Sequence, residues 1–187
     1  MKDSFRRRIT ILETGRLLLR PIETADAAAF YTLFADPEVM RFGDGPQTET
    51  WVNEWIVWVR QGYAEQGYGP QAVVEKSSVS VIGYCGLFFF EDINGAAEVE
   101  LGYRLLRKAW GKGYATEAGT AVRDYAFEIL GLPRLISLID PDNNASIAVA
   151  QKLGMTREGE VMLEGYTHAD YIFSISAGQV VSKTLTR

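Results

Sequence analysis

The chain has little of the chemistry that builds disulfide frameworks or metal centres. Its 187 residues include one cysteine, Cys85, and one histidine, His168. A single cysteine excludes an internal disulfide framework, and a lone thiol inside an apolar segment is typical of a core position. A single histidine excludes a site built from several histidines, and no Cys/His cluster has the spacing of zinc ligands. We therefore predict no metal.

Long apolar runs and an excess of basic residues are also missing. No apolar run approaches the length of a membrane span, and residues 9–12, which follow the basic Arg6–Arg8, are too few for a signal peptide. The net charge of −5 argues against nucleic acid as a main partner. It favours a cationic substrate such as an amine. We expect a cytoplasmic protein with neither nucleic acid nor membrane as a partner.

What is present is the composition of an ordinary globular protein. Hydrophobic residues make up 47% of the chain and aromatic residues 12%. A chain of this length can enclose a substantial core, and no repeat or Pro/Ser-rich linker divides it. We therefore predict a single domain over residues 1–187.

Hydrophobic periodicity predicts a mixed α/β domain. The expected strands cover residues 17–22, 71–75, 79–90, 98–106, 135–139, 157–163 and 170–177. The expected helices cover residues 24–34, 49–65, 115–130 and 147–153. Thr24 is the expected N-cap of the first helix, and Asp36-Pro37 is expected to end it. Two apolar faces stand out: Trp51, Trp55, Trp58 and Val59 on the second helix, and Ala115, Ala118, Val122, Tyr125, Ala126 and Ile129 on the third.

The most informative segment is WGKGYATEA, from Trp110 to Ala118, at a predicted strand-to-helix junction. Glycines at 111 and 113 let backbone N–H groups approach a ligand closely, and a helix N-terminus offers unpaired donors to an anion. Thr116 stands where a dinucleotide fingerprint needs a third glycine, and Gly113 stands where a Walker loop needs Ser or Thr. The segment predicts an anion-binding turn of another kind. A tight turn without a ligand is the alternative.

Six further motifs accompany this segment along the chain. In order, the seven are TGRLLLRP (14–21), DPEVM (36–40), IGYCG (82–86), ELGY (100–103), WGKGYATEA (110–118), NNAS (143–146) and KLGM (152–155). In these motifs and their order the chain resembles the GNAT superfamily of acyl-CoA N-acyltransferases, and within it the RimJ/RimL type. The resemblance spans roughly residues 10–176.

The resemblance implies a fold, a cofactor and a reaction. The fold is a central twisted mixed sheet of about six to seven strands flanked by about four helices. The reaction moves an acetyl group from acetyl-CoA to a primary amine, with a protein N-terminal α-amine favoured over a small-molecule amine, in a monomer or homodimer. A longer acyl group and a catalytically silent acyl-CoA-binding module are the alternatives.

The resemblance also places the cofactor on this sequence. It puts the pyrophosphate on the amides of the glycine turn and the pantetheine arm beside the preceding strand. Asn143 has two open roles, contact with the cofactor arm and helix N-cap. The implied cofactor-binding residues are Tyr103, Arg104, Leu105, Trp110, Gly111, Lys112, Gly113, Tyr114, Ala115, Thr116, Asn143, Ser146 and Lys152.

Acyl transfer needs a neutral amine. A lysine-type amine with a pKa near 10.4 is only about one part in a thousand neutral at physiological pH, a handicap of roughly 4 kcal/mol. A general base therefore matters most for this class of acceptor. Glu98, Glu100, Gly102 and Arg104 share one face of the predicted strand. Glu100 stands where the family often has a carboxylate facing the acceptor, and we predict that it is the base, with Glu98 as its rival.

The leaving group and the acceptor are less fully specified. Many superfamily members have a tyrosine acid seven residues after the asparagine, where this chain has Ala150. Ser146 is the nearest hydroxyl at a matching position, and we predict that it hydrogen-bonds the leaving sulfur, although a thiolate can also leave unassisted. The sequence has no Cys or Ser placed as a nucleophile for a covalent acyl-enzyme. We therefore expect direct transfer of the acyl group to the amine. The expected acceptor groove, between the first two helices and the final hairpin, is lined by Met40, Phe42, Trp51, Tyr84, Phe88 and Tyr166, each of which also suits a core position.

Overall fold

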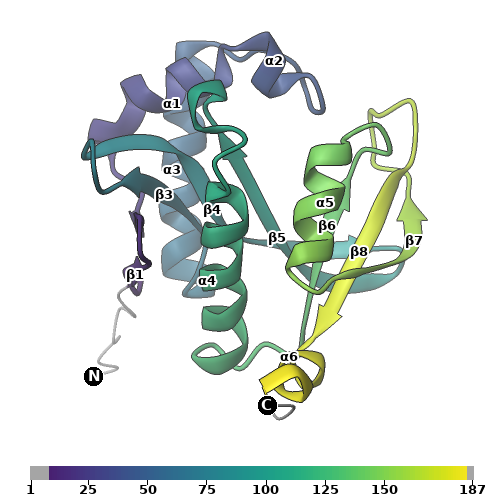
Figure 1. Ribbon diagram of the computed structural model, residues 1–187. Helices are drawn as coiled ribbons and strands as arrows, with labels where there is room; N and C mark the ends of the chain where they lie inside the picture. The colour runs from purple at the N-terminus through teal and green to yellow at the C-terminus, as the bar shows by residue number, and fades with distance from the viewer. Residues whose placement is uncertain (1–8, 185–187) are drawn as a thin grey trace, which may run out of the picture.

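A computed structural model describes residues 9–184, so the basic segment Arg6–Arg8 lies outside the described residues. The described chain forms one eight-stranded sheet with helices on both faces (Figure 1). The strands are β1 (Leu12–Glu13), β2 (Leu17–Pro21), β3 (Pro70–Glu75), β4 (Ser80–Ile93), β5 (Ala96–Leu105), β6 (Arg134–Ile139), β7 (Thr156–Val161) and β8 (Asp170–Ser176). The helices are α1 (Ala27–Phe34), α2 (Pro37–Met40), α3 (Glu49–Gln66), α4 (Tyr114–Glu128), α5 (Asn144–Lys152) and α6 (Ala177–Thr184), with 3-10 turns η1 (Thr24–Asp26) and η2 (Arg107–Ala109).

The sheet is mixed, as the family resemblance implies. Its strand order is β1-β2-β3-β4-β5-β6-β8-β7, and every neighbouring pair is antiparallel except β5 and β6. The pairing of β5 with β6 is confined to Glu100 opposite Ile136, and beyond this point the two strands separate (Figure 1). The separation leaves one edge of β5 open where the chain turns towards α4.

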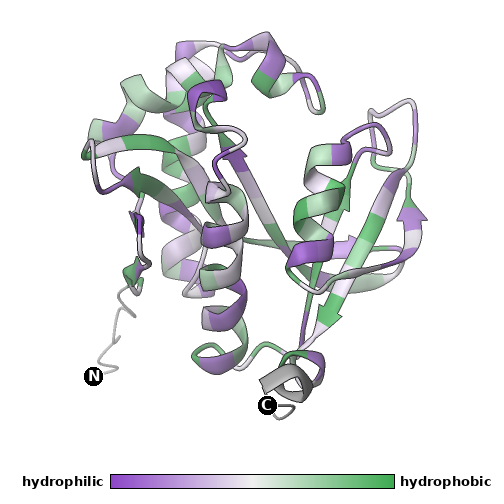
Figure 2. Cartoon of the chain, in the orientation of Figure 1, coloured by the Kyte–Doolittle hydropathy of each residue, from purple (hydrophilic) through white to green (hydrophobic). Residues whose placement is uncertain are grey.

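Two hydrophobic clusters cover the two faces of the sheet. On one face, α4 and α5 pack through Ala118, Val122 and Ala150 against the strands. On the other, α1, α2 and α3 pack around Phe30 and Phe34, with aromatic contacts to the tryptophans of α3. Figure 2 shows the matching alternation of hydrophilic and hydrophobic bands along α4. Burial of one stripe per helix holds the layers together.

Several sequence-based boundaries were wrong for local reasons. Thr24 is not a helix N-cap, because residues 24–26 form η1 with a capping box that joins Glu23 to Asp26. Asp36-Pro37 starts a helix instead of only ending one: Asp36 caps α2, and proline at the first helical position loses no intrahelical bond. The two-residue β1 raises the strand count above seven, and α2 and α6 raise the helix count above four.

Two residues assigned to apolar helix faces are exposed. Trp58 keeps 54% of its surface and Ile129 keeps 69%. Ile129 lies beyond the last residue of α4, where the chain turns away from the sheet. Within the described residues, no helix combines the length and the apolar character needed to cross a membrane.

Candidate active site

Two adjoining cavities occupy the region where β5 and β6 separate. The larger, of about 420 Å³, reaches from β5 to the start of α4. The smaller, of about 220 Å³, lies against β5, the end of β6 and α5. Six residues line both cavities, so the two cavities adjoin. The shared lining residues are Phe42, Tyr103, Arg104, Asn143, Ser146 and Val149.

The glycine turn forms one end of the larger cavity. Gly111 and Gly113 have φ values of +72° and +79°, a left-handed conformation that a side chain would strain. Gly113 occupies the N-cap position of α4 but has no side chain to accept a hydrogen bond from the first helical amides. These amides can therefore donate to a ligand. Tyr114, Ala115 and Thr116 line the cavity beside them. This end of the cavity therefore suits an anion.

An ionic clamp that sequence reasoning missed holds this turn against the sheet. The carboxylate of Glu117, in the first turn of α4, accepts hydrogen bonds from the Thr14 hydroxyl (2.6 Å) and from Arg16 Nε (2.7 Å) and N (2.9 Å). Arg16 also donates through Nη1 to the Lys112 carbonyl (2.9 Å). Burial opposes ionisation of Glu117, but these donors outweigh it and lower its pKa. Both motifs were visible in the sequence; their contact was not.

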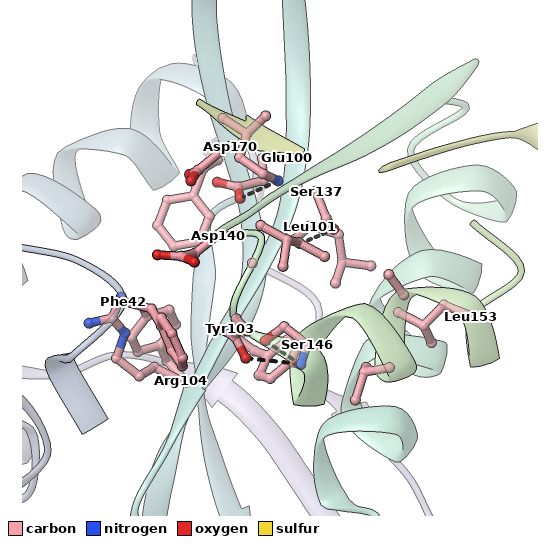
Figure 3. Close-up of a pocket in the computed structure, with 18 residues that line it drawn as sticks. Phe42, Glu100, Leu101, Tyr103, Arg104, Ser137, Asp140, Ser146, Leu153 and Asp170 are labelled. Atoms are coloured by element: carbon pink, nitrogen blue, oxygen red, sulfur yellow. Dashed lines mark hydrogen bonds between the residues drawn. The ribbon is translucent and has the colours of Figure 1, made fainter. Parts of the chain in front are cut away.

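Glu100 lies in the smaller cavity. Its Oε1 accepts a hydrogen bond from the Leu138 amide (3.2 Å), and Figure 3 shows its carboxylate near those of Asp140 and Asp170. Desolvation raises the pKa of Glu100 to about 7; the nearby Asp170 adds to the increase, whereas Leu138 and Arg104 oppose it. A carboxylate of this pKa can take a proton near neutral pH.

Glu98, the rival on the same strand face, is engaged elsewhere. Arg134 Nε lies 3.1 and 3.2 Å from its two oxygens, and the same guanidinium pairs with Glu158. Glu98 is not among the described residues that line either cavity. The structure therefore separates the two candidates by environment, which sequence alternation cannot do.

A pair of hydroxyls lies where the cavities meet. The Tyr103 hydroxyl donates to Ser146 Oγ (3.1 Å; Figure 3). Burial raises the pKa of Tyr103 to about 12, so its hydroxyl stays protonated at neutral pH. Asn143 is the N-cap of α5, where its Oδ1 accepts from the Ser146 amide (3.1 Å), and its side chain lies beside both cavities. Ala150, on α5 itself, is a buried residue that lines the smaller cavity.

Three residues that sequence reasoning left unassigned gather at the far side of the smaller cavity. His168 Nε2 lies 3.0 Å from Asp140 Oδ2 and 3.6 Å from Asp170 Oδ1. Antiparallel pairing of β6 with β8, with Ile139 opposite Tyr171, brings the two aspartates together. The sequence predicts both strands but not their register, so it gives no sign of this cluster.

The expected acceptor residues divide into three groups. Phe42, Tyr84 and Phe88 line the smaller cavity. Met40 and Trp51 pack in the hydrophobic cluster around α1 and α3. Tyr166 lies in the loop before β8, where its hydroxyl is 3.0 Å from Asp44 Oδ1 and joins the final hairpin to the loop after α2.

The predicted cofactor-binding residues are brought together with one exception. Lys112 does not line the larger cavity; its carbonyl is held by Arg16. The Leu105 carbonyl is also engaged, because it accepts from Trp110 Nε1 (2.7 Å). The residues that do line the larger cavity are Tyr103, Arg104, Leu105, Trp110, Gly111, Gly113, Tyr114, Ala115, Thr116, Asn143, Ser146 and Lys152.

Comparison with known proteins gives one family. The family model described as "Acetyltransferase (GNAT) domain" matches residues 16–156 of the chain. The chain is 33% identical over 172 residues to p20 of Bacillus licheniformis, an N-acetyltransferase that is itself uncharacterised. That match covers 88% of this chain and 94% of the relative.

Solved structures agree in fold. An acetyltransferase from Agrobacterium tumefaciens str. C58 matches with a TM-score of 0.77 and 31% identity, over 89% of this chain and 94% of that one. RimL, a ribosomal L7/L12 alpha-N-protein acetyltransferase solved with coenzyme A, matches with a TM-score of 0.75, over 89% of this chain and 98% of that one. At 20% identity, the second likeness shows the fold alone.

Proposed function

The chain belongs to the GNAT acetyltransferase family and is an acetyl-CoA-dependent N-acetyltransferase, and we propose that it moves the acetyl group directly onto a primary amine in a ternary complex. The acceptor is a peptide N-terminal α-amine or a small-molecule amine. The seven sequence motifs support assignment to the RimJ/RimL type. The supporting observation is the meeting of two cavities at Tyr103 and Ser146, one ending in free helix amides and the other lined by Glu100.

The larger cavity fits the cofactor. Its uncapped helix start offers amide donors to the pyrophosphate of coenzyme A, and the open edge of β5 offers main-chain groups to the pantetheine arm. Acetyl-CoA supplies an activated acetyl group as a thioester. Gly111, Gly113, Tyr103 and Asn143 would hold and orient it, so that the acyl end points towards the shared wall.

Glu100 is the proposed general base, acting on the acceptor directly or through water. Its pKa of about 7 leaves a large fraction ionised at neutral pH while keeping it basic enough to accept a proton. The acceptor ammonium gives up two protons in the overall reaction. One passes to Glu100, and the other balances the departing thiolate as the C–N bond forms and the C–S bond breaks.

Ser146 is the proposed hydroxyl for the leaving sulfur. It accepts a hydrogen bond from Tyr103, which leaves its own hydrogen free to donate into the cavities. Hydrogen bonding from a preorganised donor is stronger in a site that excludes water.

A thiol-release assay tests the proposal. Purified protein is incubated with acetyl-CoA and a panel of amines and N-terminal peptides, and free thiol and acetylated product are measured. We expect thiol release that depends on the amine and equals the amount of product. Tight coenzyme binding with no release across the panel would instead indicate a silent acyl-CoA-binding module.

A further inference from the structure

The smaller cavity has strongly uneven charge. Figure 3 shows Glu100, Asp140 and Asp170 gathered at one side and Arg104 beside Phe42 at the other. All of these residues line the cavity. The basic side chains facing the carboxylates are Arg104 and the half-exposed His168, whose Nε2 lies 3.0 Å from Asp140 Oδ2 and 3.6 Å from Asp170 Oδ1. Three carboxylates therefore share one side of a small cavity with a single imidazole beside them.

Asp170 is the unusual member of this group. Only 9% of its surface is exposed, and its Oδ1 makes no hydrogen bond in the described structure. His168 Nε2 is 3.6 Å from this oxygen, beyond hydrogen-bonding distance, and instead contacts Asp140 at 3.0 Å. A buried carboxylate without a donor is costly, so a cation held in the cavity beside the Asp140–Asp170 pair would stabilise that pair.

The remaining walls of the cavity favour an organic cation. Tyr84 and Phe88 lie across from Arg104 and Glu100 on the paired strand β4, and both rings line the same space. Aromatic faces attract ammonium groups, and an alkyl chain packs against them. The Asp140–Asp170 pair and the proposed base Glu100 therefore lie at two points of one aromatic-walled cavity.

We propose that the acceptor is a diamine or polyamine whose reacting amine lies beside Glu100 while a second ammonium pairs with Asp170 and Asp140. The inference rests on the proposed function and narrows its acceptor. The reacting nitrogen forms the C–N bond as the C–S bond breaks, and its two protons go as described above. The second ammonium keeps its protons and acts only in binding.

The test compares two amines of equal chain length. We measure kcat/KM for diaminobutane and for butylamine, with saturating acetyl-CoA, in the wild-type protein and in Asp170→Asn. A charge-assisted hydrogen bond predicts a wild-type preference for the diamine of roughly tenfold to a hundredfold. Asp170→Asn is expected to bring the ratio close to one. The matched control Glu128→Gln, which removes a charge at the far end of α4, is expected to keep the ratio.

Other outcomes are equally decisive. A wild-type ratio near one would overturn the inference while leaving the transferase intact, and it is measurable even if Asp170→Asn fails to fold. Absence of acetylation of any amine or peptide would overturn the proposed function itself. Thermal stabilisation by zinc chloride that is lost in both Asp170→Asn and His168→Gln, with no diamine preference, would show that the cluster is a metal site. An ammonium site predicts that His168→Gln keeps the preference.

Discussion

At the scale of single residues, the environment of a carboxylate decides what it can do. Glu98 and Glu100 share a strand face, yet Arg134 neutralises the first, whereas the second lies in a cavity with other acids. The raised pKa of Glu100 follows from burial before any other cause. The desolvation that makes Glu100 a useful base also means that its ionised form lowers the stability of the folded protein. Activity and stability measurements test these two effects separately.

The first prediction concerns the pH dependence of activity. Glu100 acts when ionised, so wild-type kcat/KM should rise as pH increases through about 7. Glu100→Gln should lower the rate at neutral pH by roughly tenfold to a thousandfold, with partial rescue at higher pH as the acceptor deprotonates unaided. Stopped assays across the pH range measure both profiles. Unchanged rates in the variant would remove Glu100 from the mechanism.

The second prediction concerns stability. The pKa of Glu100 is 4.5 in the unfolded chain and about 7 in the folded chain. The free energy that protonated Glu100 contributes to folding is therefore fully present below pH 4.5 and is lost as the pH rises through about 7. Glu100 is only partly buried by its accessible surface, so Glu100→Gln should be more stable than wild type in alkaline buffer by about 1 to 3 kcal/mol. Urea unfolding at acid and alkaline pH measures the difference. A variant that is less stable at high pH would show that the carboxylate is not desolvated.

The third prediction concerns the hydroxyl pair. Ser146→Ala and Tyr103→Phe should each lower kcat about tenfold, with little change in the KM for the amine. Each substitution removes one member of the same hydrogen-bonded pair of hydroxyls. The double variant should lose hardly more than either single one. Steady-state kinetics on the four proteins completes the cycle. Strictly additive losses would mean that the two hydroxyls act independently.

At the scale of elements, the decisive contact joins the first strand region to the central helix. Thr14 and Arg16, before and at the edge of β2, hold Glu117 in the first turn of α4. Arg16 also lies over the Tyr114 ring, 4.5 Å from its centre to the guanidinium carbon. The clamp thus fixes the position of the amides that end the larger cavity.

The fourth prediction tests this clamp. Glu117→Gln should raise the KM for acetyl-CoA several-fold, leave kcat nearly unchanged, and lower stability by about 1 to 2 kcal/mol. Because the folded-state pKa of Glu117 is lowered, its contribution is present above 4.5 and should fade as pH falls through the folded value. Glu128→Gln, on the same helix, is the matched control. A higher KM for the amine alone would contradict the assigned role.

The sequence predicts elements better than it predicts their contacts. Periodicity placed all seven longer strands, and the glycine motif placed the start of α4, because these signals are local. Register is not local: the meeting of Asp140 with Asp170 depends on how β6 pairs with β8. Ile129 illustrates the same limit. Helical spacing places it on the buried face of α4, but the helix ends at Glu128 and Ile129 is exposed. Local patterns also could not show that Asn143 caps α5 while lining both cavities.

At the scale of the whole molecule, the site follows from a single break in the sheet. Pairing between β5 and β6 is limited to one position, and the helices α4 and α5 flank the opening that results. One side of the opening presents helix amides and the other presents carboxylates. The opposite electrostatic characters of the two cavities suit an anionic cofactor and a cationic acceptor that must meet at one point.

The most direct test of this account is calorimetric titration of coenzyme A into wild type, Gly113→Val and the control Gly131→Val. Both glycines have positive φ and lie at opposite ends of α4. We predict saturable binding by wild type and by Gly131→Val, and binding at least about tenfold weaker in Gly113→Val, because the side chain distorts the turn whose amides hold the pyrophosphate. Equal affinity in all three proteins, or no wild-type binding, would contradict the account.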